Sequence, residues 1–278
     1  MLKIIPFIGI LLLSSHLWAD NTSSPLTLGI HPYLNPEVLK KRFSPLADHL
    51  SNQLQRPINI QVANNYAEHI RYIGTDQLDI AYMGPASYVQ MIAEYGEKPT
   101  LACLEVNHRT WFQGVIINRQ DHPANELSDL QNARFAFGDP HSTMSHLVPR
   151  YMLMEAELVK GLNSRFLGSH SNVAEAVLMG DFDAGAVKEA VFHAQKANGL
   201  KALAFTPKLS EHLFITRSTL PTELIKRLRL MLQNVHQQPG GEKILHAIKP
   251  SITRLMPVKS GDYDNLMKIM HSLQQAGF

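Results

Sequence analysis

The chain has 278 residues, of which 45% are hydrophobic, and its 26 basic residues nearly balance its 24 acidic ones. This balance argues against nucleic acid or an acidic membrane surface as the partner. A chain of this length can bury one large core or two smaller ones.

The first 19 residues have the pattern of a cleavable secretory signal. Lys3 precedes an apolar run over residues 4–13, and a small residue, Ala19, stands just before Asp20. The run is too short to span a membrane, and no second long apolar run follows it. We therefore expect cleavage near Ala19, which removes Lys3 and leaves 25 basic residues against 24 acidic ones.

Cys103 is the only cysteine, so an internal disulfide is excluded, and no cysteine follows the apolar run for attachment of a lipid. A secreted chain without disulfides fits the bacterial periplasm better than the extracellular space. The sequence thus predicts a protein that crosses the inner membrane and works in the periplasm.

Strand-like and helix-like segments alternate in the first third of the mature chain. Asn35 followed by Pro36 predicts a helix start, because proline suits the first helical position after an N-cap. The segments are strands expected at 26–30, 58–62 and 78–83, and helices expected from 36, at 66–73 and at 87–95. Such alternation predicts a parallel α/β sheet.

The alternation breaks near residue 100 and resumes near residue 134. Two strand-like runs, 101–106 and 111–118, follow each other without a helix, and a polar connector leads to the next series. In that series we expect strands at 134–138, 165–167, 184–187, 200–205 and 212–216, with helices ending at 158 and spanning 173–179 and 190–198. The part from residue 221 onward has a helical pattern.

This order of elements predicts two α/β lobes joined by two chain crossings, near residues 115–121 and 204–210. Lobe 1 is expected to comprise residues 20–117 and 208–278, and lobe 2 residues 118–207. Open α/β sheets bind ligands beyond the carboxyl ends of their strands. Two facing lobes of this kind form a cleft that can close.

Polar side chains gather in the turn that precedes the first helix of lobe 2. The turn carries Ser142, Thr143, Ser145 and His146. Backbone N–H groups at a helix start are unpaired, and hydroxyls add donors without charge, so the turn suits phosphate, phosphonate or carboxylate. The alternative is that the hydroxyls only cap their own helix. Pro149 requires the helix either to restart there or to bend.

Three further strand ends carry candidate ligand-binding residues. Tyr82 and Gly84 precede one helix, where glycine allows close approach of the backbone and tyrosine offers a polar tip. His170 precedes a helix whose capping box is expected to begin at Asn172. Lys188 ends another apolar strand, where its ammonium can meet an anion. The alternatives are structural packing of the tyrosine and the histidine and a solvated lysine.

Enzyme and metal motifs are absent from the sequence. It contains no Gly-x-Ser-x-Gly, no phosphate-binding glycine-rich loop and no His-Glu-x-x-His. His141 and His146 are five positions apart, which does not place two metal ligands on one helical face. We expect no enzyme activity, no metal and no cofactor. An extracytoplasmic hydrolase is the alternative from another functional class.

Four stretches together resemble the phosphate/phosphite/phosphonate-binding family of periplasmic substrate-binding proteins of ABC transporters. They are "NPEVLKKRFSPLADHLSNQL", "LDIAYMGPASYV", "DPHSTMSHLVPRYML" and "GSHSNVAEAVLMGDFDAGAV", and the likeness covers nearly the whole mature chain. It implies a two-lobe, type II-like α/β fold, a small oxyanion held in the cleft, an inner-membrane ABC permease as partner, and no catalysis. We expect a monomer. A ligand sensor that works with a membrane histidine kinase is the alternative within this fold.

Residue by residue, the resemblance assigns Ser142 and Thr143 to the family's oxyanion-binding hydroxyls. It assigns Tyr82 to the region of a cleft aromatic residue and His170 to a cleft histidine.

The chain departs from the family pattern at two places. Met144 and Ser145 stand where the family turn usually has a third hydroxyl and a glycine. Lys188 stands where an acidic or amide residue is often found, and in aminophosphonate binders an acid there meets the ammonium of the ligand. A lysine cannot do so, and the resemblance therefore implies a plain oxyanion or another anionic solute.

Overall fold

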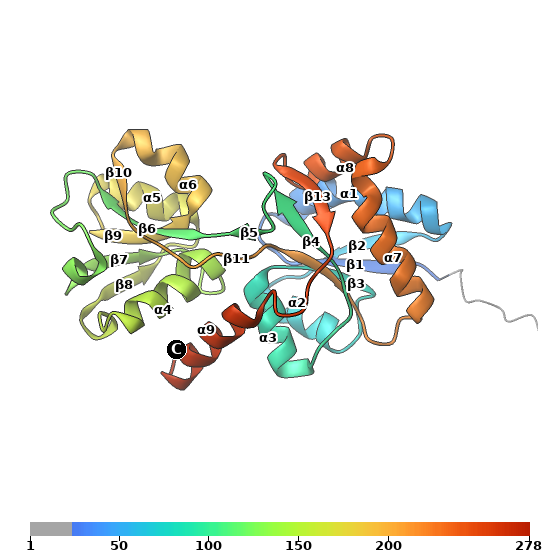
Figure 1. Cartoon of the computed structure of the whole chain (residues 1–278), viewed down its shortest axis with the longest axis horizontal. Coiled ribbons are helices and arrows are strands. Elements are labelled where there is room, and N and C mark those ends of the chain that lie inside the picture. Colours follow the sequence, from blue (N-terminus) through green and yellow to red (C-terminus); the bar gives the residue numbers. More distant parts are fainter. Residues whose placement is uncertain (1–23) are drawn as a thin grey trace, which may run out of the picture.

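The computed structural model describes residues 24–278, which form two α/β lobes around separate sheets (Figure 1). The expected signal sequence lies outside the described residues. No helix in residues 24–278 is long and apolar enough to cross a membrane. The two-lobe architecture expected from the sequence is confirmed.

Lobe 1 is built on a six-stranded sheet with the order β13-β4-β12-β3-β1-β2. Its strands are β1 (Leu26–Ile30), β2 (Ile58–Val62), β3 (Ile80–Met83), β4 (Thr100–Val106), β12 (Leu213–Thr216) and β13 (Ile252–Met256). Its helices are α1 (Pro36–Leu54), α2 (Tyr66–Gly74), α3 (Pro85–Tyr95), α7 (Thr222–Asn234), α8 (Gly241–Ile248) and α9 (Asp264–Gln275), with a short 3-10 turn at Val235–Gln237.

Lobe 2 is built on a five-stranded sheet with the order β10-β6-β9-β7-β8. Its strands are β6 (Gly114–Arg119), β7 (Arg134–Phe137), β8 (Asn163–Phe166), β9 (Ala184–Lys188) and β10 (Leu200–Phe205). Its helices are α4 (Val148–Glu155), α5 (His170–Met179) and α6 (Glu189–Gln195), preceded by a π-helical turn at Thr143–Leu147 and joined by 3-10 turns at Leu127–Leu130, Val159–Gly161 and Lys196–Asn198.

The two chain crossings pair with each other as a small antiparallel ribbon of β5 (Trp111–Phe112) and β11 (Leu209–Ser210). The strand-like run expected over 111–118 is therefore two strands, and β6 belongs entirely to the second sheet. The expected lobe boundary at residue 117 falls inside β6. The chain leaves lobe 1 earlier than expected. Apolar residues lie on both sides of Gln113, so the sequence does not show where one sheet ends and the next begins.

The parallel pairing expected for β1, β2 and β3 is confirmed, although both complete sheets are mixed. In lobe 1, β1 pairs in parallel with β2 and β3, whereas β12 runs antiparallel to β3 and β4. The chain returns from lobe 2 through β12 without a helical crossover, and this route reverses the strand direction. Strand β13 was not expected, because it lies within a segment whose overall pattern is helical.

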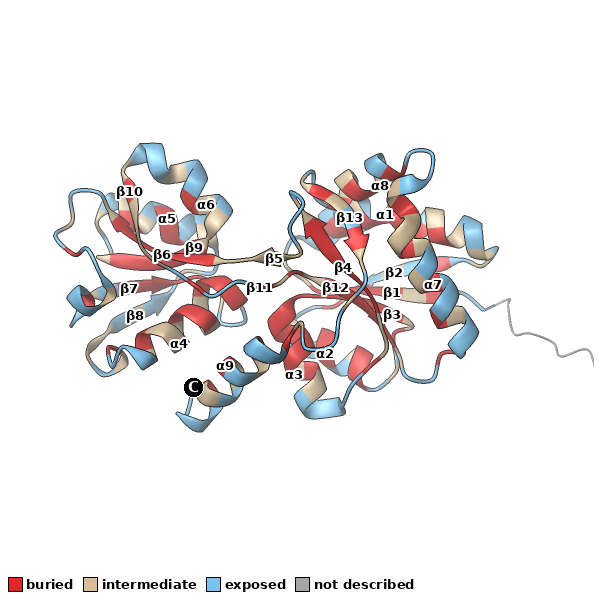
Figure 2. Ribbon diagram, in the orientation of Figure 1, coloured by how far each residue is buried: buried red, intermediate tan, exposed pale blue. Residues whose placement is uncertain are grey.

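The cores lie between the sheets and their covering helices, and the exposed residues lie on the outer faces of the helices (Figure 2). The expected start of α1 is confirmed, since the Asn35 side chain accepts a 3.0 Å hydrogen bond from the Glu37 N–H and Pro36 follows it. In the lobe 1 core, Tyr82 packs between Phe43 and Phe214, with ring centroids 4.9 and 5.1 Å away.

Helix α9 connects the lobes on the side of α3 and α4 (Figure 1). The guanidinium of Arg150 in α4 lies 5.0 Å from the ring centroid of Phe278, just beyond α9. Met144 and Val148 of lobe 2 are buried in the same apolar cluster as Met83 and Leu213 of lobe 1. The turn at residues 142–146, called the hydroxyl turn below, is thus held against lobe 1 by apolar contacts on one side.

Candidate ligand-binding cleft

A cavity of about 770 Å³ lies between the two lobes. Residues from both lobes and from the β5 crossing line it, so lobe motion changes its shape. Seven of the eight residues predicted from the sequence line the cavity, namely Tyr82, Gly84, Ser142, Thr143, Ser145, His170 and Lys188.

The hydroxyl turn contains both a cap and free donors. Ser142 is the N-cap of the π-helical turn, and its Oγ accepts a 3.1 Å hydrogen bond from the Ser145 N–H. The capping alternative therefore holds for Ser142. Thr143, next along the chain, is 9% exposed, lines the cavity, and has no hydrogen bond to its hydroxyl among the described residues.

Two other residues of this turn mainly shape it. The Ser145 hydroxyl is buried without a partner in residues 24–278 and packs against Gly138, where a Cβ would lie only 2.0 Å from the Oγ. Met144 is fully buried among residues of both lobes, and Thr206 contacts its sulfur at 3.5 Å. The departure from the family turn at Met144 therefore serves packing between the lobes.

His146 does not line the cavity, which corrects the sequence-based prediction. Its Nδ1–H donates to the Pro140 carbonyl at 2.6 Å, and Arg150 Nε donates to its Nε2 at 2.7 Å. The ring also packs edge-on against Phe137 and Phe166. Burial lowers the pKa of His146 to about 4, so it is a neutral structural histidine. Each step of one residue along an α-helix changes the direction of the side chain by about 100°. The sequence therefore could not show whether His146 faces the cavity or the protein interior.

The turn also resolves the question posed by Pro149. The π-helical turn ends at Leu147, and α4 begins at Val148 with Pro149 in its first turn. Leu147 and Val148 both have right-handed helical φ and ψ, so the π-helical turn continues into α4 without a break, and Pro149 is the second residue of α4.

His170 is the first residue of α5 and presents one ring nitrogen to the cavity. The helix is capped by Ser169, whose Oγ accepts from the Asn172 N–H at 3.1 Å, so the capping box expected at Asn172 is wrong. The Lys188 N–H donates to His170 Nδ1 at 3.1 Å, which leaves the proton on Nε2. Burial, with the charge of Lys188 as a smaller cause, lowers the pKa of His170 to about 3. It is therefore a neutral donor.

The start of α3 brings backbone donors into the cavity from lobe 1. Gly84 is the N-cap and supplies no side-chain cap, and Pro85 follows it. Ala86 and Ser87 line the cavity, and their N–H groups belong to the unpaired first turn. An uncapped helix start of this kind favours an anion through both its donors and its dipole.

Lys188 is partly buried, and its ammonium lies 5.5 Å from the centroid of the Phe112 ring. Burial lowers its pKa, and the nearby charge of Glu211 acts in the opposite direction. Glu211 itself is buried. Burial alone would raise the pKa of Glu211, but the hydrogen bond from His212 and the charges of His212, Lys249 and Lys188 lower it to about 2. The cavity therefore contains a buried carboxylate beside a partly buried ammonium.

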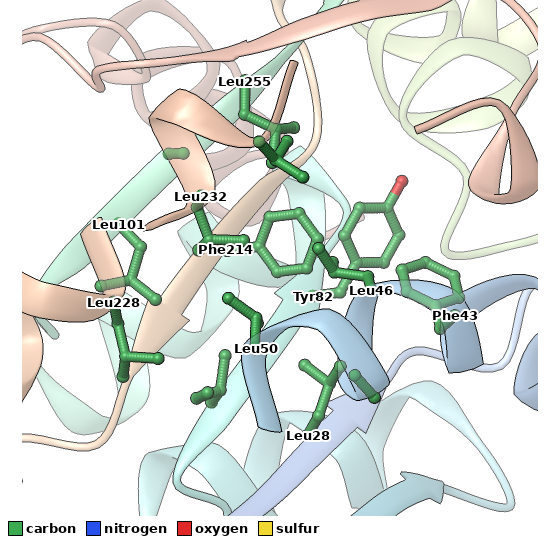
Figure 3. Packing of buried hydrophobic residues seen from close by; sticks show 14 of the residues in the cluster. Leu28, Phe43, Leu46, Leu50, Tyr82, Leu101, Phe214, Leu228, Leu232 and Leu255 are labelled. Carbon is green, nitrogen blue, oxygen red and sulfur yellow. The ribbon is translucent and has the colours of Figure 1, made fainter. Parts of the chain in front are cut away.

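Tyr82 packs in the core of lobe 1 and also lines the cavity. Its ring is 4% exposed, and Figure 3 shows the hydroxyl oxygen pointing away from the surrounding leucines. Its ring stacks on His212 with centroids 5.6 Å apart and planes 16° apart. Burial raises the pKa of Tyr82 well above its usual value, so the hydroxyl keeps its proton and can donate.

Sequence reasoning missed two histidines of the lobe 1 wall, His31 and His212. His31 directly follows β1, and the same strand-end rule that selected Tyr82 and Gly84 would have selected it. His212 precedes β12, and its place in the cavity depends on β12 running antiparallel to β3. That direction is not visible in the order of elements along the chain.

Across residues 24–278, no group of three histidine, cysteine, aspartate or glutamate side chains is arranged to hold a metal ion. Two mixed α/β lobes on paired crossings, with the uncapped start of α3 and several hydroxyls lining the cavity between them, define the class of two-lobe substrate-binding proteins.

Within this class, the family model for the periplasmic substrate-binding protein of phosphonate ABC transporters matches residues 28–263, and the chain belongs to this family. It is 26% identical to a probable ABC transporter phosphite-binding protein of Prochlorococcus marinus, across 95% of this chain and 97% of the relative. It is 25% identical to a phosphate-import protein of Mycolicibacterium smegmatis, across 77% of this chain and 72% of that protein.

The solved structures agree with this assignment. The structure of the Prochlorococcus marinus protein in complex with methylphosphonate superposes with a TM-score of 0.76 at 25% identity, covering 90% of this chain and 98% of that one. This chain is thus a periplasmic substrate-binding protein of the phosphonate ABC-transporter family.

Proposed function

We propose that this chain captures a small phosphorus oxyanion between its lobes and delivers it to an inner-membrane ABC permease. The observation that carries the proposal is that two sets of unpaired donors line one cavity from opposite lobes. Lobe 1 supplies the uncapped start of α3, and lobe 2 supplies Thr143 and the first turn that follows Ser142. Oxyanions are the ligands that such paired helix starts suit best.

His170 and Lys188 complete the oxyanion site from lobe 2. The Nε2–H of His170 is a fixed donor, because the Lys188 N–H occupies Nδ1. The cavity contains three cationic side chains, Arg42, Lys188 and Lys249, against two carboxylates, Asp139 and Glu211. Counted from these lysine, arginine and carboxylate side chains, the lining carries one net positive charge, which favours an anion.

The relatives support phosphorus as the central atom. One is named for phosphite, its structure contains methylphosphonate, and another is named for phosphate import. All three anions present at least two oxygens to donors and differ in the fourth substituent. The proposal therefore includes phosphate, phosphite and small phosphonates as candidate ligands.

The proposed protein is a monomer that works in the periplasm after cleavage near Ala19 and catalyses no reaction. The buried carboxylate of Glu211 accepts two hydrogen bonds from His212, which fix both side chains in the cleft. Rigid donors of this kind suit binding of an anion by closure of the lobes.

A thermal-shift screen followed by calorimetry tests the proposal. Phosphate, phosphite, methylphosphonate, sulfate and small carboxylates are compared, and a bound ligand raises the melting temperature by mass action. At least one phosphorus anion is expected to bind. Failure of all three, or tighter binding of a carboxylate, would reject the proposed ligand class. Turnover of generic phosphate esters by the purified protein would reject the proposal that it catalyses nothing.

A further inference from the structure

Two buried histidines form the lobe 1 wall of the cavity beside the start of α3. His31 is only 3% exposed, and neither of its ring nitrogens has a hydrogen-bond partner in residues 24–278. His212 is different, because its Nδ1–H donates to the Glu211 carboxylate at 2.9 Å. The Nε2 of a neutral His212 is therefore a hydrogen-bond acceptor.

These two rings converge over the α-carbon of Gly84. A Cβ placed on Gly84 would lie 3.1 Å from His31 Cε1, 3.4 Å from His31 Nδ1 and 3.7 Å from His212 Nε2. The ring centroids are 5.5 Å apart. Since glycine has no side chain, the space between the rings stays open beside the unpaired N–H groups of α3. An oxygen of an anion bound at α3 can thus reach an imidazole nitrogen.

The surroundings of the two rings favour their neutral forms. Burial lowers the pKa of His31 well below its usual value, and the charges of His212, His69 and Lys188 lower it further. Burial also lowers the pKa of His212, although Glu211 acts against this. The other titratable groups near the pair are Tyr33, Tyr66, Tyr82 and Lys249.

From this geometry, and on the basis of the proposed function, we propose that the bound anion donates an acidic O–H to His212 Nε2, with His31 beside it as the second contact. The site then selects oxyanions that keep a proton near neutral pH and rejects those that do not. Phosphorus oxyanions belong to the first class, because they lose their last ionisable proton only around neutral pH. Sulfate and sulfonates belong to the second class.

The selectivity follows from the acceptor at His212. When a fully ionised oxygen of the ligand faces the unprotonated Nε2 of His212, two hydrogen-bond acceptors face each other and neither has a donor. Sites built to hydrogen-bond a hydroxyl discriminate against analogues that lack it by large factors. A sulfonate can restore the missing proton only by taking one from solvent onto a buried ring, which becomes less favourable as the pH rises.

Calorimetry with matched anions tests the inference. Methylphosphonate as its monoanion and methanesulfonate have the same charge and nearly the same shape, and they differ by one proton. At pH 6.5 we expect the parent protein to bind methylphosphonate at least about a hundredfold more tightly than methanesulfonate, and phosphate more tightly than sulfate. Affinity for methylphosphonate should fall as the pH rises above the second pKa of the ligand.

Three variants locate the effect. His212→Phe keeps an aromatic ring in place and removes the acceptor nitrogen, and we expect at least tenfold weaker binding of methylphosphonate with a reduced preference over methanesulfonate. His31→Phe keeps the ring and removes two unpaired nitrogens, so we expect weaker binding with an equal or higher melting temperature. His236→Phe is the control, because His236 also has a buried ring nitrogen without a partner but does not line the cavity.

The outcomes separate this inference from the proposed function. Binding of methylphosphonate with equal affinity for methanesulfonate, or with affinity that rises with pH, would overturn the inference and leave the proposed function intact. An unchanged preference in a folded His212→Phe protein would also overturn it. If none of the phosphorus anions binds to the parent, the proposed function fails and the inference fails with it.

Discussion

The carboxylate of Glu211 accepts a 2.9 Å hydrogen bond from Nδ1 of its neighbour His212, and the same oxygen accepts from the His212 backbone N–H at 3.2 Å. This pair sets the orientation of the imidazole toward Gly84. It also keeps a buried carboxylate ionised inside the cleft, with Lys249 3.9 Å away.

We expect Glu211→Gln to destabilise the protein at neutral pH, and the size of the effect to depend on pH. The folded pKa of Glu211 is lowered to about 2 from 4.5, so its stabilising contribution is present above pH 4.5. That contribution is lost as the pH falls from 4.5 toward 2, because the unfolded chain takes up the proton first. Urea unfolding of parent and variant at a series of pH values measures the difference. A difference that does not shrink on acidification would contradict this account.

Replacements in the hydroxyl turn should separate binding from stability. Thr143→Val removes a free hydroxyl, and the loss of a hydrogen bond to a charged ligand is worth about 1.5–3 kcal/mol, or roughly 10- to 150-fold in affinity. Ser142→Ala removes the cap of the turn and should cost about 0.5–2 kcal/mol of stability. Calorimetry and urea unfolding measure the two effects.

Ser44→Ala is a suitable control for these variants, because this exposed hydroxyl only donates to the Lys40 carbonyl of its own helix. Its affinity and stability should stay near those of the parent. If Thr143→Val binds the ligand like the parent, Thr143 is not part of the site.

Lys188 should discriminate against ligands that carry their own ammonium group. Two cations held close together in a site of low effective dielectric repel each other. We expect the parent to prefer ethylphosphonate over 2-aminoethylphosphonate, Lys188→Met to bind both anions more weakly, and Lys188→Asp to lose the plain anion and to admit the aminated one weakly. Competition calorimetry measures these preferences.

The exposed Lys160 offers a control, since Lys160→Met removes the same charge outside the cavity. Parent protein that favours the aminated ligand would refute the role of Lys188. The same conclusion would follow if both Lys188 variants bound like the parent.

His146 should make the protein sensitive to acid although it does not line the cavity. Its folded pKa is lowered to about 4 from 6.5, so the unfolded chain binds this proton first as the pH falls. Its contribution is therefore present above pH 6.5 and is lost between pH 6.5 and 4. Below about pH 4 the Nε2 of the folded protein is itself protonated and can no longer accept from Arg150. We expect His146→Phe to lose less stability than the parent over this range in urea unfolding. Parallel pH profiles for the two proteins would argue against this role.

Much of the cleft followed from local sequence patterns. The start of α1 at Asn35 and Pro36 and the donor-rich turn at Ser142 and Thr143 depend only on neighbouring residues, since capping is decided within one helical turn. The alternation of apolar strands and amphipathic helices likewise reports burial of one face, and this was enough to predict two α/β lobes.

Tertiary structure decided which of the polar residues near strand ends face the ligand. His146 and His170 both lie between a strand and the helix that follows it, yet one packs against Phe137 and the other lines the cavity. Strand β13 and the antiparallel direction of β12 were also decided by contacts distant in sequence.

The lobe 1 wall shows the physical reason most directly. Strand pairing places Ile30 beside Tyr82 and Met83 beside Leu213. His31 and Gly84 follow the first two strands, and His212 precedes the third, so all three come to the same edge of the sheet. The sequence by itself determined that polar groups and glycine stand next to these strands. Only the register and direction of strand pairing, which join residues as far apart in sequence as Met83 and Leu213 through backbone hydrogen bonds, brought the two imidazoles together over one glycine.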